Sequence, residues 1–322
     1  MDISKWKKVK KGMLASLWRL EMYAPIIVFC YNRKEHLEKT LYALEQNRLA
    51  NQSEIYIFAD GSRGEKDKEA VEEVRDYLKV YRTKTCFKTI EVIESEKNKG
   101  LANSIIEGVS RIIEKYGKVI VVEDDLVTSA DFLEYMNQTL DFYEEDEKIW
   151  SVTGYTLPLK GLKTYKEDVY LSYRASSWAW GTWKDRWETV DWDVKDFKEL
   201  SQSPKMQKQL NRGGREMFQM LKAQQEGKNN SWAIRWCYSQ SKQNKYTVHP
   251  KFCKVKNIGG DGSGENSLAS KKYLTELDDT PVTLIDIKPN KKILKQFRDY
   301  YRLTMEEIWV LGIAKIRREF GK

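Results

Sequence analysis

Three consecutive acids, Glu123-Asp124-Asp125, are the residues whose type and spacing most directly suggest chemistry in this chain. They follow a run of four apolar residues, Val119–Val122. Unpaired charge at the end of a buried strand is costly. A divalent cation removes that cost, because Mg²⁺ and Mn²⁺ bind carboxylate oxygens and complete their coordination with phosphate oxygens and water. A solvated acidic turn, or a cap for a helix starting near Ala130, is the alternative interpretation.

The backbone expected for the triplet separates its side chains. Successive side chains on an extended backbone point in opposite directions, so Glu123 and Asp125 are expected on one side and Asp124 on the other. One acid could then bind a ribose while another binds a metal ion. The triplet therefore predicts a metal and diphosphate site.

The elements that must position the triplet alternate between strands and helices. Apolar runs predict strands at 26–31, 54–59, 89–94 and 118–122, and the intervening sequence predicts helices at 34–47, 66–80 and 101–115. This alternation indicates a parallel sheet with both faces covered. Ligands of such sheets bind at the carboxyl ends of the strands. Asn32-Arg33, Asp60 and the triplet each follow a strand, so we expect them at one edge of the sheet.

The second half of the chain is rich in tryptophan, above all at 176–187 (SSWAWGTWKDRW). Aromatic faces stack on sugar rings as well as pack cores, so Trp178, Trp180 and Trp183 are candidates for binding an acceptor sugar. Buried tryptophan belongs more often to a core, and we expect one of the three to face a ligand. Residues 196–230 predict polar helices, and residues 246–268 predict a loop-rich segment.

The glycine-rich stretch 259–264 (GGDGSG) lies in that segment. It lacks the GxxxxGK pattern and does not join a strand to a helix, which excludes a P-loop. A lid that closes over a diphosphate and an ordinary surface turn are both open interpretations.

The net charge of +8 is concentrated at the two ends of the chain. Residues 1–25 carry six Lys/Arg and two acids, and residues 287–322 carry ten Lys/Arg and four acids. This distribution argues against a nucleic-acid-binding groove and favours ends that touch an anionic surface, such as a membrane. Residues 2–23 predict an amphipathic helix, which could lie in a membrane interface or pack on the domain.

Cysteine and hydropathy patterns suggest a location for the chain. Its four cysteines share no CxxC spacing, which argues against a zinc site and is compatible with a reducing cytoplasm. No apolar run reaches the ~18–20 residues of a membrane span, and no signal-peptide pattern follows the basic start. We expect a cytoplasmic protein, bound peripherally to the inner face of the cell membrane by its basic ends.

Three segments resemble a known family of enzymes. Ala24–Arg33 with His36-Leu37 is similar to the opening of nucleotide-sugar glycosyltransferases of the GT-A fold. Lys118–Tyr135 (KVIVVEDDLVTSADFLEY), followed by Trp150-Ser151-Val152, resembles the metal-binding segment of N-acetylglucosaminyltransferase I and its bacterial relatives. Trp178–Trp187 and 257–264 resemble bacterial capsule and lipopolysaccharide members of that group, which are family 2-like.

The resemblance covers roughly residues 24–268 and implies an architecture. The fold would be GT-A (Rossmann-like), a mixed, mainly parallel sheet flanked by helices, with basic helical termini. We expect a basic amphipathic segment at 1–23, a glycosyltransferase domain at 24–285 and a basic helical segment at 286–322. The domain would divide into a nucleotide-sugar and metal half at 24–127 and an acceptor half at 128–285.

The resemblance also implies a reaction. The chain would be an inverting, divalent-metal-dependent hexosyl- or N-acetylhexosaminyltransferase, with Mn²⁺ or Mg²⁺ as cofactor. Its donor would be a nucleoside-diphosphate sugar, with a UDP-sugar favoured. Its acceptor would be a glycan, either free or lipid-linked, in bacterial surface polysaccharide synthesis.

The donor-site residues that the resemblance implies fall into two groups. Asp125 would bind the metal directly, and Glu123 and Asp124 would contact the ribose and the surroundings of the metal. The nucleotide would be bound by residues at the ends of the first three strands: Tyr31, Asn32 and Arg33 at the base or ribose, Asp60 accepting from the base, and Lys99 or the backbone near Gly100 and Leu101.

The catalytic base is where this chain departs from the family. In N-acetylglucosaminyltransferase I an aspartate beside a tryptophan acts as the base, but the matching segment here has Ala233 and Ile234. Asp185, Glu226 and Asp261 are the remaining candidates, with Asp185 the first choice because it follows the Trp178–Trp183 stretch. Asp185 could equally be a surface partner of Arg186 or Lys184.

Two other functions remain open from the sequence. A sugar nucleotidyltransferase also binds nucleotides on such a sheet and uses a divalent ion, but it usually has a glycine-rich basic loop after the first strand. Residues 31–36 (YNRKEH) contain no glycine. A non-catalytic carbohydrate-binding protein that kept the fold is the second alternative, because the tryptophan-adjacent aspartate is missing.

Overall fold

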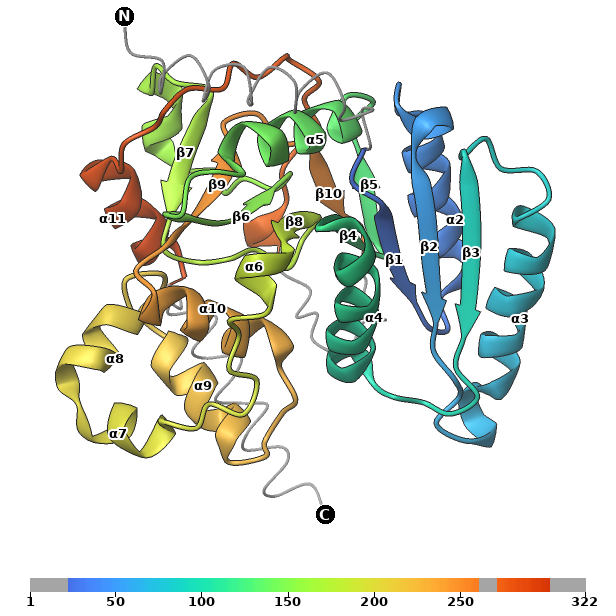
Figure 1. Ribbon diagram of the computed structural model, residues 1–322, viewed down its shortest axis with the longest axis horizontal. Helices are drawn as coiled ribbons and strands as arrows, with labels where there is room; N and C mark the ends of the chain where they lie inside the picture. The colour runs from blue at the N-terminus through green and yellow to red at the C-terminus, as the bar shows by residue number, and fades with distance from the viewer. Residues whose placement is uncertain (1–22, 261–270, 302–322) are drawn as a thin grey trace, which may run out of the picture.

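The computed structural model describes residues 23–260 and 271–301 (Figure 1). Its centre is an eight-stranded sheet with the strand order β3-β2-β1-β4-β8-β6-β9-β7. The strands are β1 (Ile26–Cys30), β2 (Glu54–Ala59), β3 (Thr89–Glu94), β4 (Lys118–Glu123), β6 (Ile149–Thr153), β7 (Val169–Ser172), β8 (Trp180–Trp183) and β9 (Tyr246–Pro250). A small second sheet pairs β5 (Leu126–Thr128) with β10 (Val255–Asn257).

The strand directions make the large sheet mixed and mainly parallel. The pairs β1–β2, β2–β3, β1–β4 and β6–β9 are parallel. The pairs β4–β8, β6–β8 and β7–β9 are antiparallel. All five residues of β1 are buried, as expected for a strand inside a parallel sheet covered on both faces. The predicted fold class is therefore confirmed, and the four strands predicted in the first half are all present.

Helices cover both faces of the sheet. They are α2 (Lys34–Glu45), α3 (Glu65–Tyr81), α4 (Leu101–Tyr116), α5 (Phe132–Tyr143), α6 (Lys184–Trp187), α7 (Phe197–Gln202), α8 (Pro204–Leu210), α9 (Met217–Gln225), α10 (Trp232–Lys242) and α11 (Lys291–Tyr300). Short 3₁₀ turns are η1 (Ala50–Gln52), η2 (Lys160–Thr164) and η3 (Lys271–Tyr273). Apolar side chains of α2, α3 and α5 share one core, and those of α4 and α10 share the other. The sheet separates these cores, so α2 and α4 lie on opposite faces (Figure 1).

The predicted helices of the first half agree with α2, α3 and α4 to within a few residues, and α7 to α9 occupy the stretch predicted as polar helices. The helix predicted at 2–23 lies outside the described residues. Of the basic helical segment predicted at 286–322, α11 is described, and residues 302–322 lie outside the described residues. None of the helices within the described parts of the chain is long and apolar enough to cross a membrane.

A buried lysine next to the small sheet forms hydrogen bonds with residues 278–280 of the C-terminal part of the chain. The Nζ of Lys254 donates to the carboxylate of Asp131 at 2.7 Å and to the backbone carbonyls of Asp278 and Thr280 at 2.8 and 2.7 Å. The Lys254 side chain is fully buried, and a buried ammonium is very costly unless its hydrogen bonds are satisfied. These contacts therefore fix residues 278–280 against β10 and the loop before α5.

Candidate active site

The polar residues predicted to form a site meet at the carboxyl ends of the parallel strands. Phe29 of β1 is in register with Glu123 of β4, and Cys30 is in register with Ala59 of β2. The residues that follow these three strands therefore share one edge, as the sequence predicted. The site is built from the segment after β1, Asp60 after β2, and the acidic triplet at the end of β4.

Arg33 is the cation at the centre of this edge. Its Nη2 lies 3.0 Å from the Oδ2 of Asp125 and also pairs with the carboxylate of Asp124. The partial burial of the guanidinium would lower the pKa of Arg33, but the two carboxylates outweigh this effect and raise it. Its other terminal nitrogen, Nη1, is buried and has no hydrogen-bond partner among the described residues. Arg33 therefore contacts Asp124 and Asp125 of the triplet. The contact with the nucleotide base or ribose that the resemblance implies stays a prediction.

Burial and the mutual proximity of the acids oppose full ionisation of the acidic triplet. Burial raises the pKa of Glu123 to about 8, and the charges of Asp125 and Asp124 add to the increase. Burial also raises the pKa of Asp124 to about 6, against the opposing effect of Arg33. Closely spaced carboxylates that resist ionisation are stabilised by additional positive charge. The electrostatics of the triplet therefore favour a second cation.

Two distant segments hold the aspartates of the triplet in place. The Thr40 hydroxyl of α2 donates to the backbone carbonyl of Asp124 at 2.7 Å. From the other half of the chain, Asn257 Nδ2 donates to Asp125 Oδ1 at 3.2 Å, and the Ile258 amide donates to the Asp125 carbonyl at 2.8 Å. The pairing of β5 with β10 brings Asn257 opposite Leu126, next to the triplet. The backbone of the two aspartates is therefore held from both halves of the chain, and Asn257 orients the carboxylate of Asp125.

Gly259 lies beside the Asp125 carboxylate, where there is no room for a side chain. A methyl group on its Cα would overlap the Asp125 carboxylate and lie 3.1 Å from Arg33 Nη1. Any larger residue would have to displace Asp125 or the segment 257–260. The start of the glycine-rich stretch is therefore part of the site, and its residues 261–264, including Asp261, lie outside the described residues.

Asp60 has a structural role in addition to its predicted contact with the nucleotide base. Its Oδ1 accepts from the amides of Gly61 and Lys99, both at 2.9 Å, and its Oδ2 accepts from the amide of Gly100 at 3.0 Å. Asp60 is buried, and Gly100, at φ +74, immediately precedes α4. The carboxylate therefore fixes the loop that begins α4. The contact with the base stays a prediction.

The other predicted nucleotide-binding residues lie around this loop. Tyr31 is half-buried, and its hydroxyl pairs with Asp67 at the start of α3. Asn32 is also half-buried. The Lys99 side chain turns to the surface and pairs with Glu107 at 2.5 Å. Leu101 is the first residue of α4 and packs against the core beneath that helix. All four lie on the predicted edge.

The arrangement fits a small divalent cation. Asp124 and Asp125 converge on one cationic group, the guanidinium of Arg33, so two carboxylates already face a single positive charge. No cluster of three or more His, Cys, Asp or Glu side chains suited to a metal ion occurs within residues 23–260 and 271–301. A Mg²⁺ or Mn²⁺ ion here would take one or two carboxylates and fill its other positions with phosphate and water, as these hard ions usually do in nucleotide sites.

Two of the three predicted sugar-binding tryptophans are core residues. Trp180 and Trp183 are 0% and 2% exposed. Trp180 packs against Trp236, Trp232 and Trp187 at ring-centroid distances of 4.3, 5.3 and 5.7 Å. Burial removes Trp180 and Trp183 as acceptor-binding residues, which corrects the prediction.

Trp178 is the partly exposed member of the three. It packs edge-on against Tyr155 at 4.5 Å. Since β8 is antiparallel to β4, residues before Trp180 lie at the carboxyl end of β4, beside the acidic triplet. The expectation that one of the three faces a ligand is compatible with this position.

Asp185 lies at the wrong end of the sheet to be the base. Lys118, the first residue of β4, is in register with Trp183, and the Lys184 amide donates to the Gly117 carbonyl at 2.8 Å. Asp185 is therefore beside the amino end of β4, opposite the triplet. Its side chain is 66% exposed and pairs with Arg186 at 2.7 Å. The surface-partner alternative is correct, and the catalytic assignment of Asp185 is wrong.

Glu226 offers no better candidate. It caps the C-terminal end of α9, is exposed, and pairs with Lys228 at 2.6 Å. That ion pair, outweighing the effect of burial, lowers the pKa of Glu226. The third candidate, Asp261, lies outside the described residues.

Sequence reasoning missed the hydrogen bond from Asn257 and the close approach of Gly259 as parts of the candidate metal site. Both residues lie in a stretch singled out for its resemblance to capsule enzymes, but nothing in it signalled contact with Asp125. The one available signal was a short strand, Val255–Asn257, separated from a glycine pair only by Ile258.

Comparison with known proteins assigns the chain to a family. Residues 7–192, more than half of its length, match the GNT-I family. The chain belongs to the GNT-I family. The predicted relationship to nucleotide-sugar glycosyltransferases, and with it the predicted class of enzyme, is confirmed by this match. No curated protein matches the sequence.

Several solved structures share part of the fold of this GNT-I family member. Residues 1–349 of S. aureus TarS are 17% identical, with 41% of this chain and 35% of that chain covered and a TM-score of 0.31. A second S. aureus TarS structure is 16% identical, with 41% and 21% covered and a TM-score of 0.32. The mannosyltransferase PcManGT from Pyrobaculum calidifontis, in complex with GDP-Man and Mn²⁺, is 12% identical, with 51% and 45% covered and a TM-score of 0.34. The chain spans less than half of each of these proteins.

Proposed function

We propose that this protein is an inverting, divalent-metal-dependent glycosyltransferase that transfers a sugar from a nucleoside-diphosphate sugar, a UDP-sugar by preference, to a glycan acceptor. The observation that carries the proposal is the convergence of Asp124, Asp125 and Arg33 at the carboxyl edge of the sheet in a member of the GNT-I family. Two acids and one fixed cation at that edge suit a diphosphate bound together with a metal ion.

Each residue of the donor half has a role in this proposal. Asp125, oriented by Asn257, and Asp124 would hold Mn²⁺ or Mg²⁺, which would act as a Lewis acid on the leaving diphosphate. Arg33 supplies positive charge beside the same carboxylates, and its unpartnered Nη1 is available to a phosphate oxygen. Asp60 keeps the loop before α4 in position for the nucleotide.

In the acceptor half, we propose that Trp178 stacks on the acceptor sugar beside the triplet. Inversion at the anomeric carbon requires a single displacement. A carboxylate base removes the proton of the attacking hydroxyl, and the nucleoside diphosphate leaves. We propose that the reaction serves bacterial surface polysaccharide synthesis in the cytoplasm, with the basic ends of the chain at the inner membrane face.

An amide substitution at the metal-binding acid tests the donor half. Asp125→Asn keeps the shape of the side chain but removes its charge, so we expect loss of Mn²⁺-dependent hydrolysis of UDP-sugars and of Mn²⁺-dependent UDP binding by calorimetry. The matched control is Asp185→Asn, which removes a carboxylate at the far end of β4 and should leave both unchanged. Undiminished hydrolysis and binding in Asp125→Asn would overturn the site assignment.

The identity of the small-molecule product separates this function from the alternatives. A glycosyltransferase releases the nucleoside diphosphate, whereas a nucleotidyltransferase acting on a sugar phosphate releases pyrophosphate. Release of UDP from a UDP-sugar supports the proposal. Release of pyrophosphate, or sugar binding with no turnover of any nucleotide sugar, would contradict it.

A further inference from the structure

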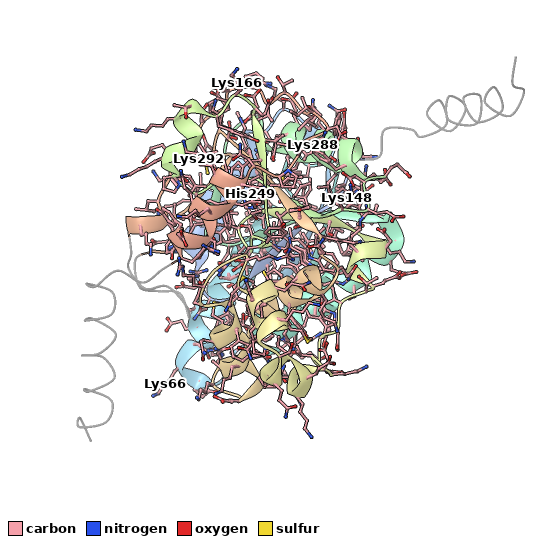
Figure 2. The ribbon with its side chains drawn as sticks, turned by 90° about the vertical axis from the view of Figure 1, so that its left-hand side faces the viewer. Lys66, Lys148, Lys166, His249, Lys288 and Lys292 are labelled. Carbon is pink, nitrogen blue, oxygen red and sulfur yellow. The ribbon has the colours of Figure 1, made fainter. Side chains whose placement is uncertain are left out.

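A concentration of exposed lysines lies where η2 packs against α11. The Gly161 amide donates to Gln296 Oε1 at 2.8 Å, and α11 buries Ile293 and Phe297 against the domain. Seven lysines on these two elements and on the segments next to them are exposed: Lys160, Lys163, Lys166, Lys288, Lys291, Lys292 and Lys295. We call the surface formed by these seven lysines the α11–η2 face. Figure 2 views the molecule from this side, with Lys166, Lys288 and Lys292 in the upper half and Lys66 at the lower end.

The charge of the α11–η2 face is largely uncompensated. Lys295 pairs with Asp299 at 3.1 Å. The other six lysines form no ion pair with any residue of 23–260 or 271–301. Within 160–168 and 286–299, Glu167 and Asp286 are the only acids classed as exposed, while Asp168 and Asp299 are half-buried. Some lysines elsewhere on the surface are paired, as on α3, where Lys68 and Lys79 contact Glu65 and Asp76. The face therefore presents a positive surface to a partner.

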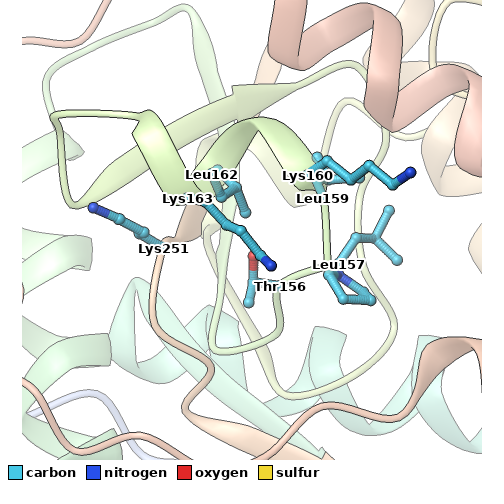
Figure 3. A pocket seen from close by; sticks show the side chains of 8 residues that line it. Thr156, Leu157, Leu159, Lys160, Leu162, Lys163 and Lys251 are labelled. Atoms are coloured by element: carbon cyan, nitrogen blue, oxygen red, sulfur yellow. The ribbon is translucent and has the colours of Figure 1, made fainter.

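An apolar hollow lies within this positive surface (Figure 3). It has a volume of about 430 Å³ and is lined by Thr156, Leu157, Pro158, Leu159, Leu162 and the lysines Lys160, Lys163 and Lys251. The three leucines are buried. Lys251 Nζ donates to the Tyr165 carbonyl at 2.8 Å, and Figure 3 shows Lys163 reaching across toward Thr156. Leucines framed by ammonium groups suit an amphipathic anion, with its charged group on the lysines and its apolar part on the leucines.

The sheet topology places the hollow on the acceptor side of the candidate site. β6 is antiparallel to β8, which is antiparallel to β4, so β6 and β4 run in the same direction. Thr156 follows the carboxyl end of β6, and its neighbour Tyr155 packs on Trp178. The hollow and the acidic triplet therefore both lie past the carboxyl ends of strands, with Trp178 between β6 and β4.

We propose that the α11–η2 face docks on the anionic headgroups of a phospholipid membrane. The charge complementarity and the apolar hollow both fit this partner, and the sequence of residues 302–322 contains five Lys/Arg and three acids. Each lysine near such a surface contributes about a fivefold gain in binding (about 1 kcal/mol). Docking through this face would present a lipid-linked acceptor on the Trp178 side of the site, and this part of the inference rests on the proposed function. The membrane contact itself does not depend on catalysis.

Vesicle binding by the full chain tests the proposal. The protein is sedimented with vesicles of phosphatidylcholine alone and with vesicles that also contain phosphatidylglycerol. We expect binding only to the second kind, and its loss in high salt, which screens exposed charges. The triple variant Lys160→Gln/Lys163→Gln/Lys292→Gln should bind phosphatidylglycerol vesicles at least about tenfold more weakly. All three lysines are exposed, so folding is expected to be unchanged, as melting temperatures would check.

A matched control separates this face from net charge. Lys66→Gln/Lys84→Gln/Lys88→Gln removes the same charge from exposed lysines near α3 and β3, at the opposite end of the sheet from β7, and should bind vesicles like the wild type. Three results would each overturn the proposal. They are equal weakening in both triple variants, undiminished binding in the Lys160/Lys163/Lys292 variant, and binding to soluble polyphosphate but not to vesicles. Hydrolysis of UDP-sugars in solution, measured on the same preparations, reports on the proposed function separately.

Discussion

The guanidinium of Arg33 lies 3.0 Å from the carboxylate of Asp125, so the residue proposed to bind the metal already has a cation as its partner. Asp124 pairs with the same group. Since like charges repel, additional negative charge would help to hold a divalent ion and Arg33 together beside these carboxylates. A diphosphate supplies that charge. The pairing thus explains why metal and nucleotide would bind together at this site.

Removing this internal cation should destabilise the metal-free protein. Arg33→Ala leaves two largely buried carboxylates unpaired, at a cost of about 3–5 kcal/mol, and Mn²⁺ should raise the melting temperature of the variant more than that of the wild type. Arg48→Ala is the control, because it removes an exposed arginine paired with Glu134 at 2.7 Å and should cost under about 1 kcal/mol. Equal Mn²⁺ shifts in Arg33→Ala and wild type would contradict the prediction.

A single methyl group at residue 259 should damage the donor site without unfolding the protein. Gly259→Ala forces Asp125 or the 257–260 segment to move, and displacement of a metal-binding group by about 1 Å can cost about a hundredfold in rate. We expect Mn²⁺-dependent UDP binding, measured by calorimetry, to weaken by at least about tenfold. Gly260→Ala is the matched control, because its methyl group meets no atom within 4 Å. Similar UDP affinities for the two variants would refute this role of Gly259.

The carboxylate of Asp60 should control the order of the loop before α4. Asp60→Ala leaves the amides of Lys99 and Gly100 without their acceptor, which should cost about 1–3 kcal/mol. Hydrogen exchange of these two amides should accelerate, while exchange in the β1 core stays slow. Asp60→Asn keeps an acceptor oxygen and should give an intermediate effect. Unchanged exchange at both amides in Asp60→Ala would show that the loop is held by other contacts.

The two kinds of tryptophan can be distinguished by what their loss affects. Trp180→Ala removes a fully buried ring from the tryptophan core and should cost about 3–5 kcal/mol of stability. Trp178→Ala removes a half-buried ring and should cost clearly less, while weakening carbohydrate binding on a glycan array. The reverse order of melting temperatures, or unaltered glycan binding in Trp178→Ala, would contradict these assignments.

Acid should destabilise the fold partly through His249. Burial lowers the pKa of His249 from 6.5 to about 4, although the ring is within hydrogen-bonding distance of the Ser172 hydroxyl and the Tyr155 carbonyl. Between pH 4 and 6.5, the imidazole of His249 binds a proton in the unfolded chain but not in the folded chain. Stability due to the neutral ring is therefore complete above pH 6.5 and falls as the pH drops toward 4, by up to about 3 kcal/mol.

Urea unfolding between pH 4 and 8 measures the effect of His249. His249→Gln keeps a hydrogen-bonding side chain that does not titrate, so its stability should fall less steeply with decreasing pH than that of the wild type. Parallel stability curves for the two proteins would exclude His249 as a source of acid sensitivity.

The first half of the site could be predicted because its strands have one plausible arrangement. Runs such as Ile26–Cys30 are apolar throughout and alternate with helices, which indicates a parallel sheet and places the residues after each strand at one edge. Arg33, Asp60 and the triplet follow from that rule. The ion pairs of Arg33 could not be predicted from that rule. The rule gives the position of the backbone, but it does not select among the conformations of a long side chain.

The second half resisted prediction for a different reason. β8 has only four residues, and nothing in Trp180–Trp183 indicates its direction. The antiparallel pairing with β4 sends Asp185 to one edge and leaves Trp178 at the other. The hydrogen bond between Asn257 and Asp125 spans 132 residues, and no local pattern reports such a contact. The residues on the acceptor side can therefore be assigned only when the direction of β8 is known.

The burial of Lys254 sets a limit on how this protein can be shortened. Its ammonium depends on the carbonyls of Asp278 and Thr280 for two of its three described hydrogen bonds. A fragment ending at residue 270 would retain the whole sheet but leave that ammonium with Asp131 alone, in a cavity newly open to water. We expect such fragments to be insoluble or protease-sensitive, and a compact catalytic fragment to require the chain at least through Thr280.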